Sequence, residues 1–295
     1  MILVTGGTGA LGSCLVTRLL QGGEAVRVVS RDPGRAAALA AGGAEVVRGD
    51  LLENDWQAAL AGVNTLVIAS HGLYPPSRRN HPAAVDGRGA RRLIDAAAAA
   101  GVGQVVYLSA AGAAPDGPVF LRIKRATEMH LRASGLRALV IRPTVLIENN
   151  ALLLLGEPLR RGQPVRLIGP GTTPMNWVSA DAVAATIVDL LQTPGEGNRT
   201  LELRGPDTLS QLECLAVLEA ALGREAARQH LPRVVASLVG RVAAPFNPGL
   251  ACLLDFILAA DGAPARPADA EVQVVGGPLA EIAARWAEAE TTAPA

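Results

Sequence analysis

Two short stretches carry residue types and spacings that could do chemistry. The first, "LVTGGTGALG", places Gly7, Gly9 and Gly12 in a G-x-G-x-x-G spacing between a strand-like apolar run and a helical run. Such a loop lets the backbone approach a pyrophosphate, which the amino end of the next helix stabilises. The second, "FLRIK", places Phe120 and Lys124 four residues apart on one helical face. The first stretch predicts dinucleotide binding, and the second leaves open whether its two side chains only pack or also act.

The glycine loop defines the first part of the expected cofactor site. In the usual reading of this spacing, Gly7 permits the tight turn, Gly9 admits the pyrophosphate and Gly12 allows the helix to pack closely on the strand. The residues expected to contact the cofactor here are Gly6, Gly7, Thr8, Gly9, Ala10, Leu11 and Gly12.

The end of the second strand-like run, "AVRVVSRDPGR", is expected to distinguish NAD from NADP. A NAD site usually places a carboxylate there for the ribose 2′-hydroxyl, and Asp32 is a candidate. However, Asp32 followed by Pro33 is also a helix start, with the aspartate as N-cap. That interpretation leaves Ser30, Arg31 and Arg35 for a 2′-phosphate, although both arginines can equally be solvated surface charges. We expect NADP(H) as cofactor, with NAD(H) less favoured.

The elements that must position these residues alternate along the first half of the chain. Apolar runs such as "NTLVIAS" and "QVVYLSA" alternate with Ala- and Leu-rich helical runs. Strands that are apolar throughout are typical of a sheet covered on both faces, and the alternation implies right-handed crossovers. We predict an α/β fold with a doubly wound parallel Rossmann sheet. Because the rhythm weakens after Pro143, we predict a Rossmann domain at 1–147 and a smaller substrate-side domain at 148–295, with a helix from about 181 returning to the main sheet.

Composition narrows the classes of partner. The 27 basic and 27 acidic residues cancel and form no basic stripe, so a nucleic-acid partner is not expected. The three cysteines and four histidines are scattered, which predicts no metal site. No secretory signal is evident. Charges and prolines interrupt the most apolar segment, 234–260, and we interpret it as buried helices, a pocket wall or a dimer face. We expect a cytoplasmic monomer or homodimer without a membrane partner.

Several motifs in order resemble one protein family. These are "TGGTGALG", "VVSRDPGR", "VVRGDL", "VVYLSA", Lys124 with Glu128, and "LVIRPTVLIENN". As a set they are similar to the atypical short-chain dehydrogenase/reductases, and within them to the NmrA-like group. The resemblance covers most of the chain, firmly to about Asp181, and does not specify a substrate.

The resemblance implies further cofactor contacts at matching positions. It assigns Asp50 and Leu51 to the adenine, Ala69, Ser70, His71 and Gly72 to the adenosine ribose and pyrophosphate, Ser109 and Ala110 to the nicotinamide ribose, and Pro143, Thr144 and Val145 to the nicotinamide. Asn149 or Asn150 matches an asparagine that the group carries at the pocket edge. For each position a plain strand-end or turn role is the alternative.

The resemblance also gives "FLRIK" a meaning. Catalytic members of the wider superfamily carry Tyr-x-x-x-Lys, in which the lysine binds the nicotinamide ribose and lowers the tyrosine pKa so that the phenol can exchange a proton. Here Phe120 stands at the tyrosine position, which argues against alcohol dehydrogenation or sugar-nucleotide epimerisation by that route. Lys124 is expected to serve the cofactor, the alternative being an ordinary helical lysine paired with Glu128 at i,i+4.

Other groups near the expected site are weaker candidates. Tyr74, in the loop "HGLYPPSRRNH", is the one tyrosine expected outside a buried strand, and Tyr74, His71 or His81 could donate a proton. Arg78 and Arg79 could steer an anionic substrate or simply be solvated, and Trp177 could wall the pocket or anchor the core.

Two functions remain open from the sequence. The first is an NADPH-dependent oxidoreductase that passes hydride to a small apolar or aromatic acceptor, such as a quinone, without a tyrosine acid. The alternative is a non-catalytic NAD(P)-binding redox sensor.

Overall fold

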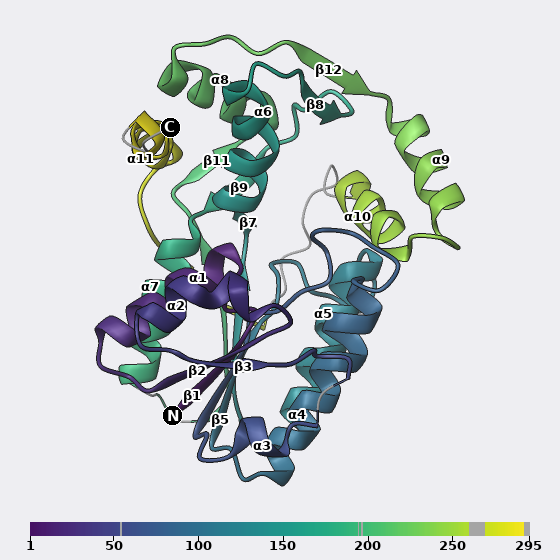
Figure 1. Ribbon diagram of the computed structural model, residues 1–295. Coiled ribbons are helices and arrows are strands. Elements are labelled where there is room, and N and C mark those ends of the chain that lie inside the picture. Colours follow the sequence, from purple (N-terminus) through teal and green to yellow (C-terminus); the bar gives the residue numbers. More distant parts are fainter. Residues whose placement is uncertain (54, 194, 196, 260–268, 292–295) are drawn as a thin grey trace.

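The computed structural model describes residues 1–53, 55–193, 195, 197–259 and 269–291 (Figure 1). Its centre is an eight-stranded sheet in which all neighbouring strands pair in parallel. The strand order is β13 (Glu271–Val274), β10 (Arg199–Arg204), β6 (Arg137–Pro143), β5 (Gln104–Leu108), β4 (Thr65–Ile68), β1 (Ile2–Thr5), β2 (Val26–Ser30) and β3 (Glu45–Arg48). The run from β3 to β6 has the order 3-2-1-4-5-6 of dinucleotide-binding sheets. The predicted doubly wound α/β fold is confirmed.

Helices cover both faces of the sheet, which explains why its inner strands are apolar throughout (Figure 1). One face carries α1 (Ala10–Gln21), the short η1 (Pro33–Ala36) and α2 (Ala37–Ala41), and α7 (Ala180–Gln192). The other carries α3 (Gln57–Leu60), the π-helical segment η2 (Ala83–Gly89), α4 (Ala90–Ala99) and α5 (Val119–Ala133). Each face has its own apolar core.

The second half of the chain builds a third core and also extends the main sheet. The third core joins β7 (Val145–Leu146), β9 (Met175–Val178) and β11 (Asp207–Leu209) with η3 (Glu148–Gly156), α6 (Glu157–Arg160), α8 (Gln211–Leu222) and α11 (Leu279–Thr291), beside the pair β8 (Val165–Ile168) and β12 (Arg228–Leu231). Trp177 is buried there and donates its indole N–H to the Leu209 carbonyl at 2.7 Å, so it acts as a core anchor. Because β10, β13 and α7 join the main unit, residues beyond 147 belong to it as well.

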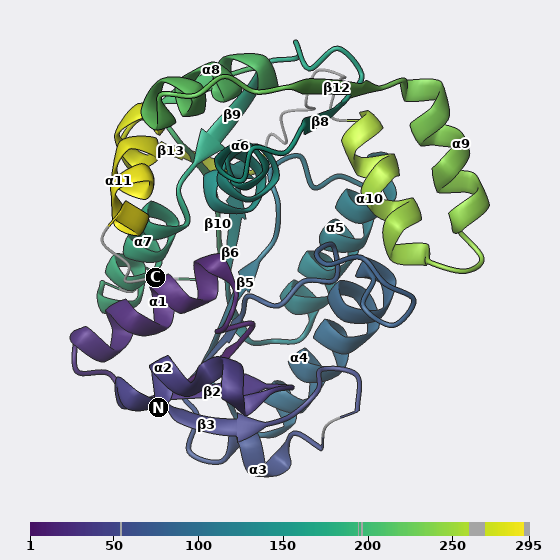
Figure 2. The same cartoon turned by 45° about the horizontal axis from the view of Figure 1, so that its top comes forward.

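A helical hairpin, α9 (Arg233–Ala243) and α10 (Pro248–Ala259), lies beside α5, with α9 outermost (Figures 1 and 2). The Asp255 carboxylate accepts a hydrogen bond from the Val119 amide at 3.1 Å, which satisfies an open donor at the start of α5. Near the other end of α10, a Cβ on Gly249 would lie 2.6 Å from the Ser77 nitrogen, so the loop after β4 packs directly on this helix. None of the helices in the described residues is long and apolar enough to cross a membrane.

Candidate cofactor and substrate site

The predicted cofactor segments gather at one edge of the sheet. Each follows one of the strands β1 to β6, and parallel strands end on the same side. The registers bring these ends level, since Thr5 is opposite Ile68 and Ile68 is opposite Tyr107. β1 lies between β2 and β4, which is the switch point where doubly wound sheets bind ligands.

The glycine loop leaves room for the backbone to fold tightly at this switch point. Gly6 has φ +76°, and a Cβ there would lie 2.5 Å from the Ser70 nitrogen, so the tight turn belongs to Gly6 and not, as expected, to Gly7. A Cβ on Gly12 would clash with the Gly6 carbonyl oxygen, which confirms the close helix packing expected there. No described side chain caps α1, whose N-cap is Gly9. Its first N–H groups therefore remain open to an anion.

The end of β2 is organised as a helix start. The Asp32 carboxylate accepts from the Gly34 amide at 3.0 Å, and Pro33 opens the 3-10 turn η1, so the N-cap interpretation is confirmed. The Ser30 hydroxyl donates to the Asp32 carbonyl at 2.8 Å. Arg31 and Arg35 are exposed, and neither forms an ion pair with another described residue. Their predicted contacts with a 2′-phosphate stay predictions.

Asp50, the carboxylate expected to contact the adenine, is held by contacts within the protein. One Asp50 oxygen accepts from the Leu52 amide at 2.9 Å, and the other lies 3.0 Å from the Arg79 guanidinium. Arg79 also reaches Glu53 at 2.5 Å, so it links the loop after β4 to the loop after β3. Leu51 is buried in the core beneath them. The adenine roles of Asp50 and Leu51 stay predictions.

The loop after β4 is fixed by short polar contacts. The Ser70 and Thr5 hydroxyls lie 3.1 Å apart, next to Ala69, which packs on the core. The Gly72 amide donates to Asp86 at 2.8 Å. The Leu73 amide donates to Nδ1 of His71 at 3.3 Å, and burial lowers the pKa of His71. His71 is therefore a neutral imidazole with its proton on Nε2.

Lys124 is buried and ion-paired, but not with Glu128. Its ammonium lies 2.7 Å from Oδ1 of Asp86 and donates to the Leu108 carbonyl at 2.7 Å. It also faces the rings of Tyr107 and Phe120, at 5.0 and 5.5 Å from their centroids. Asp86 was not predicted as a site residue. The one sign of it in the sequence is its place in "AAVDGRG", where small and apolar residues favour burial, and an acid is rarely buried unless it has a partner.

Glu128 instead forms the centre of a second buried network. Arg142 donates to its two oxygens at 2.8 and 2.6 Å, and the Ser109 hydroxyl donates to it at 2.5 Å. Arg142 also donates to Asp269 at 2.9 Å, and Arg125 does so at 2.7 Å. Together the two arginines lower the pKa of Asp269 to about 2. The Ser109 hydroxyl is therefore engaged inside the protein. Its predicted contact with the nicotinamide ribose, like that of Ala110, stays a prediction.

Phe120 lies in an apolar, partly aromatic cluster. Its ring meets that of Phe256 from α10 edge to face, with centroids 5.2 Å apart. Tyr74 borders the cluster, 6.3 Å from the His71 ring, and burial raises the pKa of its phenol to about 12. Other members are Leu73, Ala110, Leu121, Cys252, Leu253 and Ile257. The position that holds the acidic tyrosine in catalytic relatives is here part of a buried apolar cluster.

The segment after β6 completes the carboxyl edge of the sheet. The Pro143 carbonyl accepts from the Ala111 amide at 2.9 Å, and the Thr144 hydroxyl donates to Asn176 at 2.9 Å. Val145 begins β7, which connects the main sheet to the third core. The Asn150 side chain donates to the Leu146 carbonyl at 2.9 Å, so its amide serves the local backbone.

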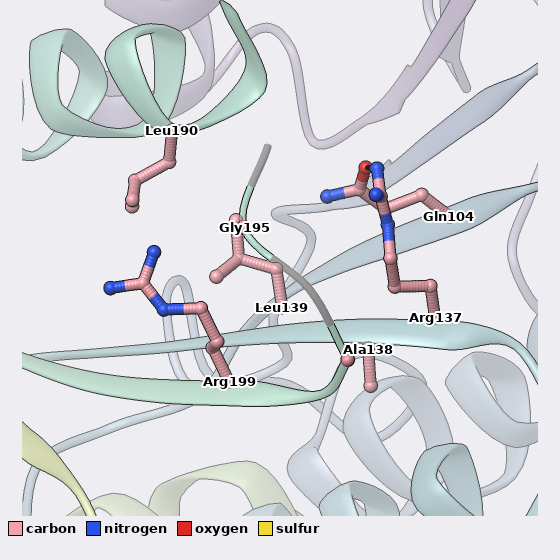
Figure 3. A pocket seen from close by; sticks show the side chains of 8 residues that line it. Gln104, Arg137, Ala138, Leu139, Leu190, Gly195 and Arg199 are labelled. Atoms are coloured by element: carbon pink, nitrogen blue, oxygen red, sulfur yellow. Dashed lines mark hydrogen bonds between the residues drawn. The ribbon is translucent and has the colours of Figure 1, made fainter. Parts of the chain in front are cut away.

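A small hollow at the opposite edge is not a competing site. Its lining includes Gln104, Arg137, Leu190 and Arg199, near the amino ends of β5, β6 and β10 (Figure 3). At about 10 Å³ it can hold at most one water molecule. The chemistry-bearing residues lie at the carboxyl edge.

Comparison with known proteins decides the family. A family model described as NAD(P)H-binding matches residues 6–194. An NAD(P)H azoreductase of Xenophilus azovorans is 32% identical over 284 residues, covering 90% of this chain and 94% of that protein. The chain belongs to the NAD(P)H-binding, NmrA-like branch of the atypical short-chain dehydrogenase/reductases.

Other relatives agree with this assignment. A (4-alkanoyl-5-oxo-2,5-dihydrofuran-3-yl)methyl phosphate reductase of Streptomyces griseus is 34% identical over 76% of this chain and 74% of that protein. The crystal structure of an NADPH-dependent quinone oxidoreductase from Escherichia coli, complexed with NADPH, covers 97% of this chain and 99% of that one with a TM-score of 0.72. At 23% identity, this likeness shows the shared fold. The predicted class, an NAD(P)H-dependent oxidoreductase, is confirmed.

Proposed function

We propose that this protein reduces a flat, conjugated acceptor of the quinone or azo type with hydride from NADPH. The observation that carries the proposal is Phe120, which stands beside Lys124 and packs on Phe256 in an apolar cluster. Such a cluster can pack against an aromatic ring and supplies no acid. The names of an azoreductase and of a quinone oxidoreductase among its relatives favour the same class of acceptor.

The residues at the carboxyl edge fit a dinucleotide. The tight turn at Gly6 and the close packing at Gly12 leave the backbone N–H groups of α1 for the pyrophosphate. Arg31 and Arg35 can form charge-assisted hydrogen bonds to a 2′-phosphate, which favours NADPH over NADH. When bound, the nicotinamide supplies the hydride.

Lys124 can orient the nicotinamide ribose. An ammonium has three N–H donors, and the Leu108 carbonyl accepts from one of them. Oδ1 of Asp86 lies 2.7 Å from the ammonium as its ion-pair partner but accepts no described hydrogen bond. A remaining N–H can bind a ribose hydroxyl, while the charge of Asp86 holds the ammonium in place. Asp86 therefore acts through Lys124 as a positioning residue.

The protein need not provide a proton for this acceptor. Hydride addition to a quinone gives a hydroquinone anion, which takes its proton from water. Tyr74, with a pKa of about 12, is a weak acid at neutral pH, and the neutral imidazole of His71 is weaker still. The protein contributes orientation of the reactants and exclusion of water.

The test is a steady-state assay of purified protein with NADPH and a panel of quinones, azo dyes and simple ketones. We expect NADPH oxidation with quinones and with azo dyes that carry a ring hydroxyl and so react as quinone hydrazones. We expect none with ketones, which need an acid as the alkoxide forms. No oxidation above the protein-free rate across the panel would contradict the proposal. A preference for ketones would show that a protein acid takes part in the reaction.

A further inference from the structure

His71 lies between the two parts of the site that the proposed reaction brings together. The amide of the next residue, Gly72, donates to Asp86 at 2.8 Å, and Asp86 is the ion-pair partner of Lys124. The two residues after Gly72 belong to the apolar cluster around Phe120. The imidazole is therefore placed where a nicotinamide oriented by Lys124 would meet an acceptor ring packed against the cluster.

The protonation state of His71 is set by its surroundings. The Leu73 amide donates to Nδ1 at 3.3 Å, so Nδ1 is an acceptor and a neutral ring carries its proton on Nε2. Burial lowers the pKa of the imidazole, and so does the charge of Lys124, while the charge of Asp86 opposes them. The ring is thus neutral at physiological pH and offers one N–H donor.

The Nε2–H group has no hydrogen-bond partner in the described part of the chain. The ring is held from other directions, by the Leu73 amide at Nδ1 and by the Tyr74 ring, whose centroid is 6.3 Å away in an edge arrangement. Nε2 is not among the fully buried polar atoms that lack a hydrogen bond, and the residue is only half-buried, so a ligand can reach it. The loop thus holds a donor in a fixed place without using it for the fold.

We propose that this N–H group donates a hydrogen bond to the acceptor oxygen that becomes negative during hydride transfer. The inference rests on the proposed function and narrows its substrate class to acceptors with a carbonyl oxygen conjugated to the reacting atom, as in quinones and quinone hydrazones. A preorganised donor stabilises such developing charge better than mobile water does. A neutral imidazole can act in this way without losing its proton.

The step balances with the proton left on His71. The acceptor gains the hydride and its two electrons from NADPH, which leaves NADP⁺, and the negative charge spreads onto the acceptor oxygen. The hydrogen bond from Nε2 strengthens as this charge grows. The hydroquinone anion then takes its proton from water. His71 acts as an electrophile, and the protein still provides no acid.

The role implied by the family resemblance leads to a different expectation. There His71 contacts the adenosine ribose or the pyrophosphate, so its loss would weaken the binding of NADPH and leave the rate with bound cofactor unchanged. The pyrophosphate already has the open N–H groups of α1, which suit an anion of its charge. The two roles differ in which constant changes, the rate of the chemical step or the Kd for NADPH.

The test compares three variants of the full chain. His71→Leu removes the N–H group and should lower the single-turnover rate of quinone reduction about ten- to a hundredfold, with the Kd for NADPH, measured by cofactor fluorescence, near that of wild type. His71→Gln has an amide N–H at about the position of Nε2 and should recover most of the lost rate. His230→Leu, at an exposed histidine of β12, is the matched control and should react as wild type does.

Circular dichroism and the measured Kd show whether each variant is folded and holds the cofactor. A His71→Leu variant with the wild-type rate, or one whose only change is a weaker Kd for NADPH, would overturn the inference and leave the proposed function standing. A His71→Gln variant as slow as His71→Leu would also overturn it, since packing and not the N–H group would then matter. No quinone reduction by the wild-type protein would overturn the proposed function and this inference together.

Discussion

Lys124 and Glu128 lie one turn apart on the same helix, yet each is paired with a different part of the fold. Lys124 meets Asp86 of η2 at the carboxyl edge of the sheet, whereas Glu128 meets Arg142 of β6. A direct pair between them at i,i+4 would contribute only about 0.2–0.5 kcal/mol. Buried charges need several close hydrogen-bond partners, and the neighbouring elements supply them.

The two clusters differ in how completely their polar groups are satisfied. Both oxygens of Glu128 are bound, one by Ser109 and Arg142 and the other by Arg142 and Arg125. The Lys124 ammonium donates one described hydrogen bond, to the Leu108 carbonyl, and Oδ1 of its ion-pair partner Asp86 accepts none. We infer that the Glu128 cluster holds the fold and that the Lys124 cluster is completed by a ligand.

The largest expected effect comes from breaking the Glu128 cluster. Arg142→Met should lower the free energy of unfolding by about 3–5 kcal/mol, because it leaves Glu128 buried without its main partner. Urea unfolding followed by circular dichroism measures this change. The remaining folded enzyme should keep its kcat/KM for NADPH. A loss below about 1 kcal/mol would show that the cluster does not hold the fold.

Breaking the Lys124 cluster should affect catalysis in addition to stability, since the Lys124–Asp86 pair is buried as well. Lys124→Met should lower kcat/KM for NADPH about ten- to a hundredfold, since a hydrogen bond from a charged donor contributes about 1.5–3 kcal/mol. The assay is run at a temperature where circular dichroism shows the variant folded.

Asp86→Asn is the matched variant for this cluster. It keeps an oxygen for the Gly72 amide and removes the charge that holds Lys124, so its loss of kcat/KM should be smaller. If Lys124→Met retained wild-type kcat/KM, the inference that a ligand completes the Lys124 cluster would be wrong.

Cofactor choice should depend on charges outside both clusters. The double variant Arg31→Ala, Arg35→Ala should reduce the ratio of kcat/KM for NADPH to that for NADH by about tenfold, because it removes the guanidinium partners of a 2′-phosphate. Arg166→Ala, an exposed arginine on β8, is the control and should leave the ratio unchanged. An unchanged ratio in the double variant would show that both arginines are only solvated surface charges.

The smallest effect is expected at the rim of the Glu128 cluster. The pKa of Asp269 is lowered from 3.8 to about 2 by Arg142 and Arg125, so its contribution to stability is full above pH 3.8 and is lost as pH falls toward 2. Asp269→Asn should therefore make the fall in stability over this window shallower. Because the side chain is 36% exposed, the loss at neutral pH should stay below about 1 kcal/mol. Urea midpoints measured across acid pH test this prediction.

The sequence predicted the fold well because its signals are local. The glycine loop, the Asp32 N-cap and the alternation of apolar strands with helices each depend on neighbouring residues. It did not reveal that β10 and β13 extend the main sheet, since short strands late in the chain carry no signal of their partner.

The buried contacts of the site could not be predicted from the sequence for a related reason. Asp86 reaches Lys124, Asp269 reaches Arg142 and Phe256 reaches Phe120 only after long segments have folded between them. In the sequence, a lysine and a glutamate at i,i+4 resemble a surface ion pair. Only the folded structure shows that each is buried and paired with another residue.

The central claim, reduction without a protein acid, is tested most directly by the pH dependence of kcat for quinone reduction. The account predicts a flat profile between about pH 6 and 9, with the same kcat in wild type and in Tyr74→Phe, because no group with a pKa in that range donates the proton. A limb in the wild-type profile that disappears in Tyr74→Phe or in His71→Gln would identify a protein acid and contradict the account.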